Sequence, residues 1–232
     1  MKIVKERGQY LSGKQKKHVN TGSYILGISV LLGMYVYFSG NLFVIFPTIF
    51  TVMISFAFFG FAINYGRGIE GENAVTKILS NLSDNYYLLN DLKLRENSGN
   101  IDHVLVGPNG VFVIETKNYS GVIICQGDEW CKYYEGKYEP KYYNLGSPSK
   151  QAKRGAVEIK KLIDESGVID KSLWVEALVV FTGDSYIEGH STVPIISVDG
   201  LHDYIKGEKS RTLSEVQIKK ISNAIAEADI ST

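Results

Sequence analysis

Two carboxylates and a lysine near the middle of the chain have the residue types and spacing to hold a divalent cation and cleave a phosphodiester. Asp102 opens one strand-like run, and Glu115 and Lys117 close the next. Alternate residues of a strand share a face, so Glu115 and Lys117 point the same way. A turn at 108–110 folds the two runs back on each other. We therefore expect Asp102 to lie at the end where Glu115 and Lys117 emerge.

These three residues would suit metal-assisted hydrolysis. Hard cations such as Mg²⁺ or Mn²⁺ take oxygen ligands, which Asp102, Glu115 and a backbone carbonyl would supply. The ion would polarise a phosphate and lower the pKa of a bound water. Lys117 would orient or help deprotonate that water and offset developing negative charge. A Glu-x-Lys pair by itself usually lies at an exposed strand end and has no catalytic role. The presence of Asp102 across the hairpin is what favours a metal-dependent active site here.

The elements that would position these residues follow one another from residue 69 onward. The fold class predicted is α/β, a mixed β-sheet flanked by helices. A Ser147 N-cap followed by Pro148 marks the start of one helix, and a tyrosine-rich hairpin turns at 135–136. Strands are expected at 86–94, 101–107, 111–117, 121–125, 173–181 and 193–198, and helices at 69–82, 148–165, 199–205 and 213–226.

Residues 23–65 contain no charged side chain and predict a transmembrane helical hairpin. The stretch divides at 39–41 into Tyr24–Phe38, which is short for a span, and Leu42–Ile63, which matches the roughly 20 residues that a bilayer requires. One span with a re-entrant partner is the alternative. Two successive apolar segments fit a signal peptide poorly. A short linker is expected at 66–68.

The charges predict the orientation of this hairpin and weaken the case for a nucleic-acid substrate. Before residue 67 there are six basic residues and one acidic residue, so residues 1–22 would be a basic cytoplasmic tail. A hairpin returns the chain to the same side, which places the domain at 67–232 in the cytoplasm, at the cell membrane. That domain has 19 basic and 24 acidic residues, so it attracts a polyanion weakly.

Several other features keep alternatives open. Lys132, Lys137 and Lys141 interleave with the hairpin tyrosines, which could stack on single-stranded bases or simply reflect strand composition, and the second reading is somewhat favoured. His103 would point away from Asp102 and is expected to be packed. The two cysteines, Cys125 and Cys131, lack metal-ligand spacing and are expected to be reduced thiols.

Several segments resemble the nuclease-related domain (NERD) family, which is grouped with the PD-(D/E)XK nuclease superfamily. The resemblance covers roughly residues 67–200 and implies a restriction-endonuclease-like core. One departure is visible: the family often has Asn-Pro shortly before a helix glutamine, whereas three residues separate Asn144 from Pro148 here. The segments that carry the resemblance are Gly71-Glu72, Ile101–Val104, Gly110–Asn118, Gly121 and Trp130.

The resemblance implies a membrane-anchored nuclease that hydrolyses DNA, or less readily RNA, with Mg²⁺ or Mn²⁺. Asp102, Glu115 and Glu72 would hold the metal, and Lys117 and Gln151 would complete the catalytic set. Glu72 could instead only cap a helix, and Gln151 could be an exposed polar residue. The main rival is a non-catalytic, membrane-tethered binding or assembly module. A phosphoesterase acting on a small molecule is a weaker third possibility. Members of the superfamily often form dimers, but the sequence leaves the oligomeric state open.

Overall fold

The chain forms two compact units. The computed structural model describes residues 1–6, 8, 10–169, 173–208 and 212–230. One unit comprises residues 9–70, and the other comprises residues 1–8 together with 71–232. The expected segments at 1–22, 23–65 and 67–232 divide the chain differently, because the first residues join the second unit. Residues 7 and 9 of the expected tail lie outside the described part.

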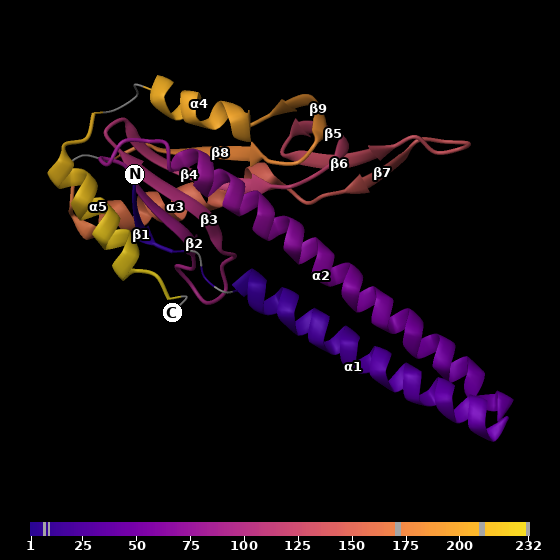
Figure 1. The fold of residues 1–232 in the computed structure, drawn as a ribbon. Coiled ribbons are helices and arrows are strands. Elements are labelled where there is room, and N and C mark those ends of the chain that lie inside the picture. Colours follow the sequence, from indigo (N-terminus) through magenta and orange to yellow (C-terminus); the bar gives the residue numbers. More distant parts are fainter. Residues whose placement is uncertain (7, 9, 170–172, 209–211, 231–232) are drawn as a thin grey trace. The chain divides into compact units, whose positions relative to one another are not determined.

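A six-stranded mixed sheet forms the centre of the larger unit (Figure 1). The β2–β3 and β3–β4 pairs are antiparallel, whereas β1 pairs with β2, β4 with β8 and β8 with β10 in parallel. This arrangement confirms the α/β class with a mixed sheet. The strand order is β1 (Lys2–Lys5), β2 (Tyr87–Leu92), β3 (Ile101–Gly107), β4 (Gly110–Lys117), β8 (Val175–Phe181) and β10 (Ile195–Ser197).

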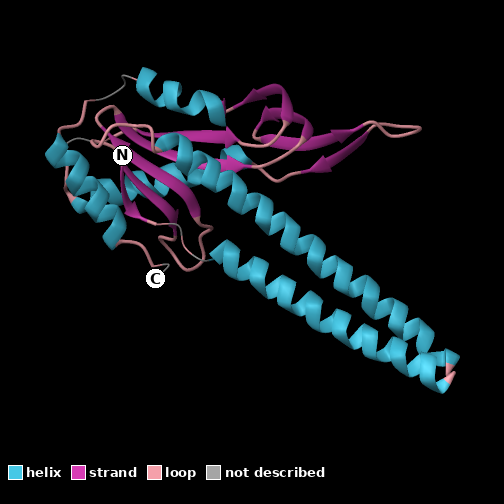
Figure 2. Ribbon diagram, viewed as in Figure 1, coloured by secondary structure: helices cyan, strands magenta, loops and turns pink. Residues whose placement is uncertain are grey.

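A second sheet of four strands, which the sequence did not predict as a separate sheet, follows β4. Its β6–β7 hairpin extends beyond the rest of this sheet (Figure 2). The strand β9 went unpredicted because its residues alternate without a clear apolar face. The order is β7 (Lys141–Asn144), β6 (Glu129–Tyr134), β5 (Gly121–Gly127) and β9 (Ser185–Ser191).

Helices cover both faces of the six-stranded sheet. On one face, α3 (Pro148–Ser166) and α5 (Glu215–Glu227) pack in a core that includes Val113 of β4. On the other face, α4 (Leu201–Gly207) and the end of α2 (Ile45–Leu79) enclose Phe112. The faces alternate along β4 because successive side chains of a strand point in opposite directions.

The strand β1 lies where a tail was expected. The Met1 amine donates to the Leu82 carbonyl at 2.7 Å, and Lys5 Nζ donates to the Asp91 carbonyl at 2.7 Å and forms an ion pair with Asp229. A four-residue strand has too little local pattern to be read from sequence, and its partners are more than 80 residues away. Residues at the start of the chain therefore complete an edge of the sheet.

The smaller unit is a pair of long apolar helices. The helix α1 spans Tyr10–Ser39, and a single 3₁₀ turn precedes α2. Gly40 has a φ of 65°, and Ser29 Oγ donates to Thr51 Oγ1 at 2.8 Å between the two helices. Both helices are long and apolar enough to cross a membrane. The uncharged segment Tyr24–Phe38 lies within α1, which has 30 residues because it also takes in the charged residues before that segment.

The expected linker at 66–68 is also wrong, because α2 continues through it to Leu79. A glycine inside a helix costs only about 1 kcal/mol relative to alanine. Two glycines flanking Arg67 are therefore insufficient to end a helix that apolar residues extend on both sides.

Candidate active site

The structure brings Asp102, Glu115 and Lys117 together at one end of the β3–β4 pair. His103 lies opposite Ile114 in the antiparallel register, so the next position outward sets Asp102 beside Glu115. The backbone N–H of Thr116 donates to Asp102 Oδ2 at 2.8 Å. The tight turn after Gly107 aligns the two strands and thereby places both carboxylates.

Glu115 and Lys117 form an ion pair along one face of β4. Lys117 Nζ lies 2.5 Å from Glu115 Oε1, and the two side chains are 19% and 7% exposed. Two residues apart on a strand, they share a face as the alternation predicts. A charged pair with so little solvent contact is much less screened than a surface pair.

The surroundings of Asp102 disfavour its ionised form. Burial raises the pKa of Asp102 well above its usual value, and the negative charge of Glu115 raises it further. The Lys117 ammonium and the Thr116 N–H act in the opposite direction, and Glu72 adds a smaller repulsion. The contribution from Glu72 indicates that its carboxylate lies close enough to act on Asp102.

The pKa of Lys117 is also raised, but by different causes. Burial lowers the pKa of the Lys117 ammonium, but the carboxylates of Glu115 and Asp102 outweigh burial, and the net pKa is raised. Lys117 is therefore cationic at neutral pH. Its chemistry in this arrangement is to donate hydrogen bonds and offset negative charge, whereas it is a poor base toward water.

Glu72 lies inside α2, seven residues before the end of the helix. The reading of Glu72 as a cap on the positive end of a helix is therefore wrong. Its neighbour Gly71 passes close to the ends of β4 and β8, since a Cβ added there would lie 2.7 Å from Thr182 Oγ1 and 3.2 Å from Asn118 Cβ. A glycine at this position lets the helix approach the site.

Gln151 and His103 do not join the three residues. Gln151 lies in the first turn of α3 with an exposed side chain, and no hydrogen bond links its amide to Asp102, Glu115 or Lys117 in the described residues. His103 is fully buried, with Nδ1 2.7 Å from Asn90 Oδ1. His103 is thus a packed histidine, as expected.

The donor chemistry at the site fits a hard divalent cation. Asp102 and Glu115 present two adjacent carboxylates against one ammonium, Lys117. Burial first, and then the adjacent Glu115 carboxylate, raise the pKa of Asp102, so a cation bound here would favour its ionised form. Oxygen-only donors suit Mg²⁺ or Mn²⁺. Within the described residues, no group of three or more His, Cys, Asp or Glu is gathered closely enough to hold a metal, so Glu72 is not part of such a group.

Asp128, which the sequence did not single out, connects three elements near α3. It accepts hydrogen bonds from Ser149 Oγ and Lys153 Nζ, both at 2.7 Å, and from Thr192 Oγ1 at 2.5 Å. Trp130 Nε1 donates to the same Ser149 hydroxyl at 3.0 Å. The network joins the β5–β6 turn to the first turn of α3 and the end of β9. Asp128 lies 21 to 64 residues from the three side chains that donate to it, so no local motif reveals the network.

We expect Asp128→Asn to lower stability at neutral pH and to lose this effect in acid. The hydrogen bond from Lys153, with those from Thr192 and Ser149, holds the pKa of Asp128 far below its usual value. The carboxylate therefore stabilises the fold above about pH 4, the unfolded pKa, and this contribution fades as the pH falls. Thermal unfolding from pH 7 to pH 3 should show the gap between the two proteins beginning to narrow below about pH 4, since the rest of the effect is lost only at the lower folded pKa. A gap that stays constant would contradict the network, and Asp164→Asn, in an exposed helical pair, is the control.

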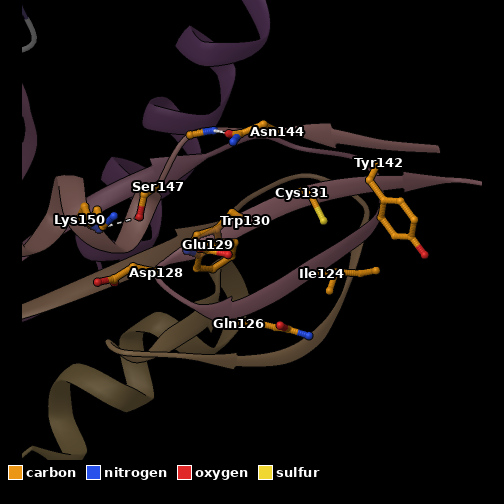
Figure 3. Close-up of a pocket in the computed structure, with 11 residues that line it drawn as sticks. Ile124, Gln126, Asp128, Glu129, Trp130, Cys131, Tyr142, Asn144, Ser147 and Lys150 are labelled. Atoms are coloured by element: carbon orange, nitrogen blue, oxygen red, sulfur yellow. Dashed lines mark hydrogen bonds between the residues drawn. The ribbon is translucent and has the colours of Figure 1, made fainter.

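A hollow of about 710 Å³ lies away from the three charged residues, beside β6 and the start of α3 (Figure 3). Gln126, Tyr142 and Asn144 face it, and Lys150 lies at its rim near the Ser147 cap. Asp128 and Glu129 also line it. Cys131 lines this hollow whereas Cys125 is buried in the core, and both are free thiols, as expected.

Comparison with known proteins assigns the domain. The nuclease-related domain family matches residues 67–182. An uncharacterized protein of Bacillus anthracis is 41% identical over 61 residues, which cover 25% of this chain and 29% of that protein. The chain thus matches well under half the length of this curated relative. No solved structure matches the chain significantly. The family match spans half of the chain, including β2 to β8 and the site, and the protein therefore belongs to the nuclease-related domain family.

Proposed function

We propose that this protein is a membrane-anchored nuclease that hydrolyses phosphodiester bonds, in DNA rather than RNA, with Mg²⁺ or Mn²⁺. The observation that carries the proposal is the meeting of Asp102, Glu115 and Lys117 at one end of the β3–β4 pair. The family match adds that the domain is nuclease-related.

Each residue would have a separate role. Asp102 and Glu115 would hold the metal, with Glu72 near enough to add negative charge. The bound ion would supply Lewis acidity, polarising the phosphate and activating water. Lys117, held cationic by its carboxylate neighbours, would offset the negative charge that builds up on the phosphate. Gln151 would have to reach the substrate from the first turn of α3, independently of the other residues.

The proposed location is the cytoplasmic side of the cell membrane. Residues 1–8 and 71–232 belong to one folded unit, so a chain that enters the bilayer between them would have to return on the same side. That condition favours two full crossings by α1 and α2, or none. The basic residues before the first apolar stretch favour the cytoplasm.

The main alternative is a tethered binding module that keeps the fold without catalysis. Lys117 already occupies one oxygen of Glu115, and the domain is acidic overall. Both features weaken the attraction for metal and nucleic acid. This alternative predicts a folded protein that binds a partner and cuts nothing.

Cleavage by the purified full chain in detergent tests the proposal. Labelled single- and double-stranded DNA and RNA would be incubated with Mg²⁺, Mn²⁺ or EDTA. We expect metal-dependent cutting, which Lys117→Ala lowers by about 10²- to 10⁴-fold, because a charge that stabilises the transition state is lost. Lys160→Ala, on the outside of α3, is the matched control. If the folded protein cuts none of these substrates, the binding module replaces the nuclease.

A further inference from the structure

The β6–β7 hairpin has two faces of different chemistry. The antiparallel register pairs Lys132 with Tyr143 and Tyr134 with Lys141, which places these four residues on one face. Neither strand contributes a carboxylate to that face, since Glu129 alternates onto the other. The face is called the lysine–tyrosine face below, and its members are Lys132, Tyr134, Lys141 and Tyr143.

This face continues the side of the domain that carries the candidate active site. Trp130 shares the face of Lys132 and belongs to the same core as Val113. Val113 in turn shares its face of β4 with Glu115 and Lys117. Trp130 stacks on Phe181 with ring centres 5.9 Å apart. The base of the hairpin and the active-site end of β4 are therefore joined by continuous packing.

Lysine and aromatic groups alternate along this face. A Cβ added at Gly121 would lie 3.9 Å from Lys132 Nζ, so this ammonium lies just beyond the segment that follows Lys117. Lys132 Nζ is 5.0 Å from the ring centre of Tyr134, which contacts Tyr143 edge-on at 5.2 Å. Tyr134 and Tyr143 are 45% and 53% exposed. With Lys141, and with Glu135 and Gly136 of the turn, they line a hollow of about 360 Å³, of the size that a small ligand requires.

We infer that the lysine–tyrosine face binds single-stranded nucleic acid and leads it toward Asp102 and Glu115. The inference rests on the proposed nuclease function and names its substrate class. Unpaired bases expose flat surfaces that stack on tyrosine, and lysines contact the intervening phosphates. The opposite face is less suitable for a polyanion because two carboxylates, Asp128 and Glu129, line its hollow, whereas Glu135 alone lines the hollow of the lysine–tyrosine face. In an acidic domain, this face supplies the local attraction that a nucleic acid needs.

Binding to the full chain in detergent with EDTA separates recognition from cleavage. The probes are fluorescein-labelled dT20, U20 and a 20-base-pair duplex, followed by anisotropy over a range of salt concentrations. We expect Tyr143→Ala to weaken binding of the single strands about 5- to 100-fold. Tyr142→Ala, next in sequence and 59% exposed on the opposite face, should leave binding unchanged. Lys132→Ala and Lys141→Ala should each lower the logarithmic salt slope by about 0.7.

The outcomes separate this inference from the proposed function. Equal weakening by Tyr142→Ala and Tyr143→Ala, or tighter binding of the duplex than of both single strands, overturns the inference. The inference is also overturned if Tyr143→Ala changes the mass measured by sedimentation while nucleic-acid binding stays unchanged. That result would assign the face to contact with a second copy of the chain. If Tyr143→Ala but not Tyr142→Ala weakens binding, and no substrate is cleaved in Mg²⁺ or Mn²⁺, the binding face is supported and the nuclease proposal is rejected. Cleavage that is unchanged by both tyrosine substitutions supports the nuclease and overturns the binding face.

Discussion

Asp102→Asn and Glu115→Gln should each reduce metal-dependent cleavage by about 10²- to 10⁴-fold, and the double variant by little more than either. Both substitutions keep the side-chain shape while removing a negative charge from the proposed metal site. The asparagine oxygen can still accept the Thr116 N–H that Asp102 accepts at 2.8 Å. The losses should be non-additive because both carboxylates would act through one ion.

Stability distinguishes this loss from unfolding. Burial and Glu115 raise the pKa of Asp102, so ionised Asp102 destabilises the fold at any pH above its unfolded pKa, and the effect is complete above the folded pKa. Asp102→Asn should therefore be as stable as the parent at neutral pH, or more stable. Single-turnover cleavage and thermal unfolding of the same samples make the test, with Glu129→Gln as an exposed control on β6. An inactive variant that is also unfolded, or losses that simply add, would count against a shared metal.

Replacing residues 9–70 by a flexible linker of about 20 residues should move nearly all of the protein from the membrane to the soluble fraction. Most apolar side chains of α1 and α2 are exposed, with only 11% and 6% of their most apolar stretches buried, so a bilayer is the natural cover for them. Residues 1–8 and 71–232 form one unit, and circular dichroism should show that the shortened protein keeps its sheet and helices. Carbonate extraction measures the partition.

Two controls sharpen this experiment. A piece that begins at residue 71 lacks β1 and its contacts to Leu82 and Asp91, so it should be less stable than the linked protein. Tags at the two ends of the full chain should be digested by protease from the same side of the membrane. Persistent membrane binding of the linked protein, or tags on opposite sides, would contradict a hairpin anchor.

The strands that carry the candidate site could be predicted because their signals are local. The strand β3 matches the expected run at 101–107, and β4 differs from its expected run only by one added residue at its start. A two-residue turn between apolar runs determines the register, and so places Asp102 near Glu115. The helix α3 begins at Pro148 as expected, because Ser147 accepts the Lys150 N–H at 3.2 Å. The cap, the turn and the alternation all involve residues close together in the sequence.

Other features could not be predicted because they depend on distant partners. The strand β1 exists only through its pairing with β2, and the Asp128 network joins segments up to 64 residues apart. The interpretation of Glu72 as a helix cap was wrong because α2 begins at Ile45, well before Glu72. For β1 and for Asp128 the deciding interaction crosses the fold, and nothing in the nearby residues reports it.

By itself the sequence determined the apolar helix pair, the shared face of Glu115 and Lys117, and the likeness to nuclease-related domains. These follow from composition and from periods of two or 3.6 residues, which are properties of a single segment. Only the tertiary structure decided that Thr116 holds Asp102, that Lys117 stays cationic between carboxylates, and that Lys132 and Lys141 share one face of the β6–β7 hairpin. Burial and strand pairing set these features, and both require the folded chain.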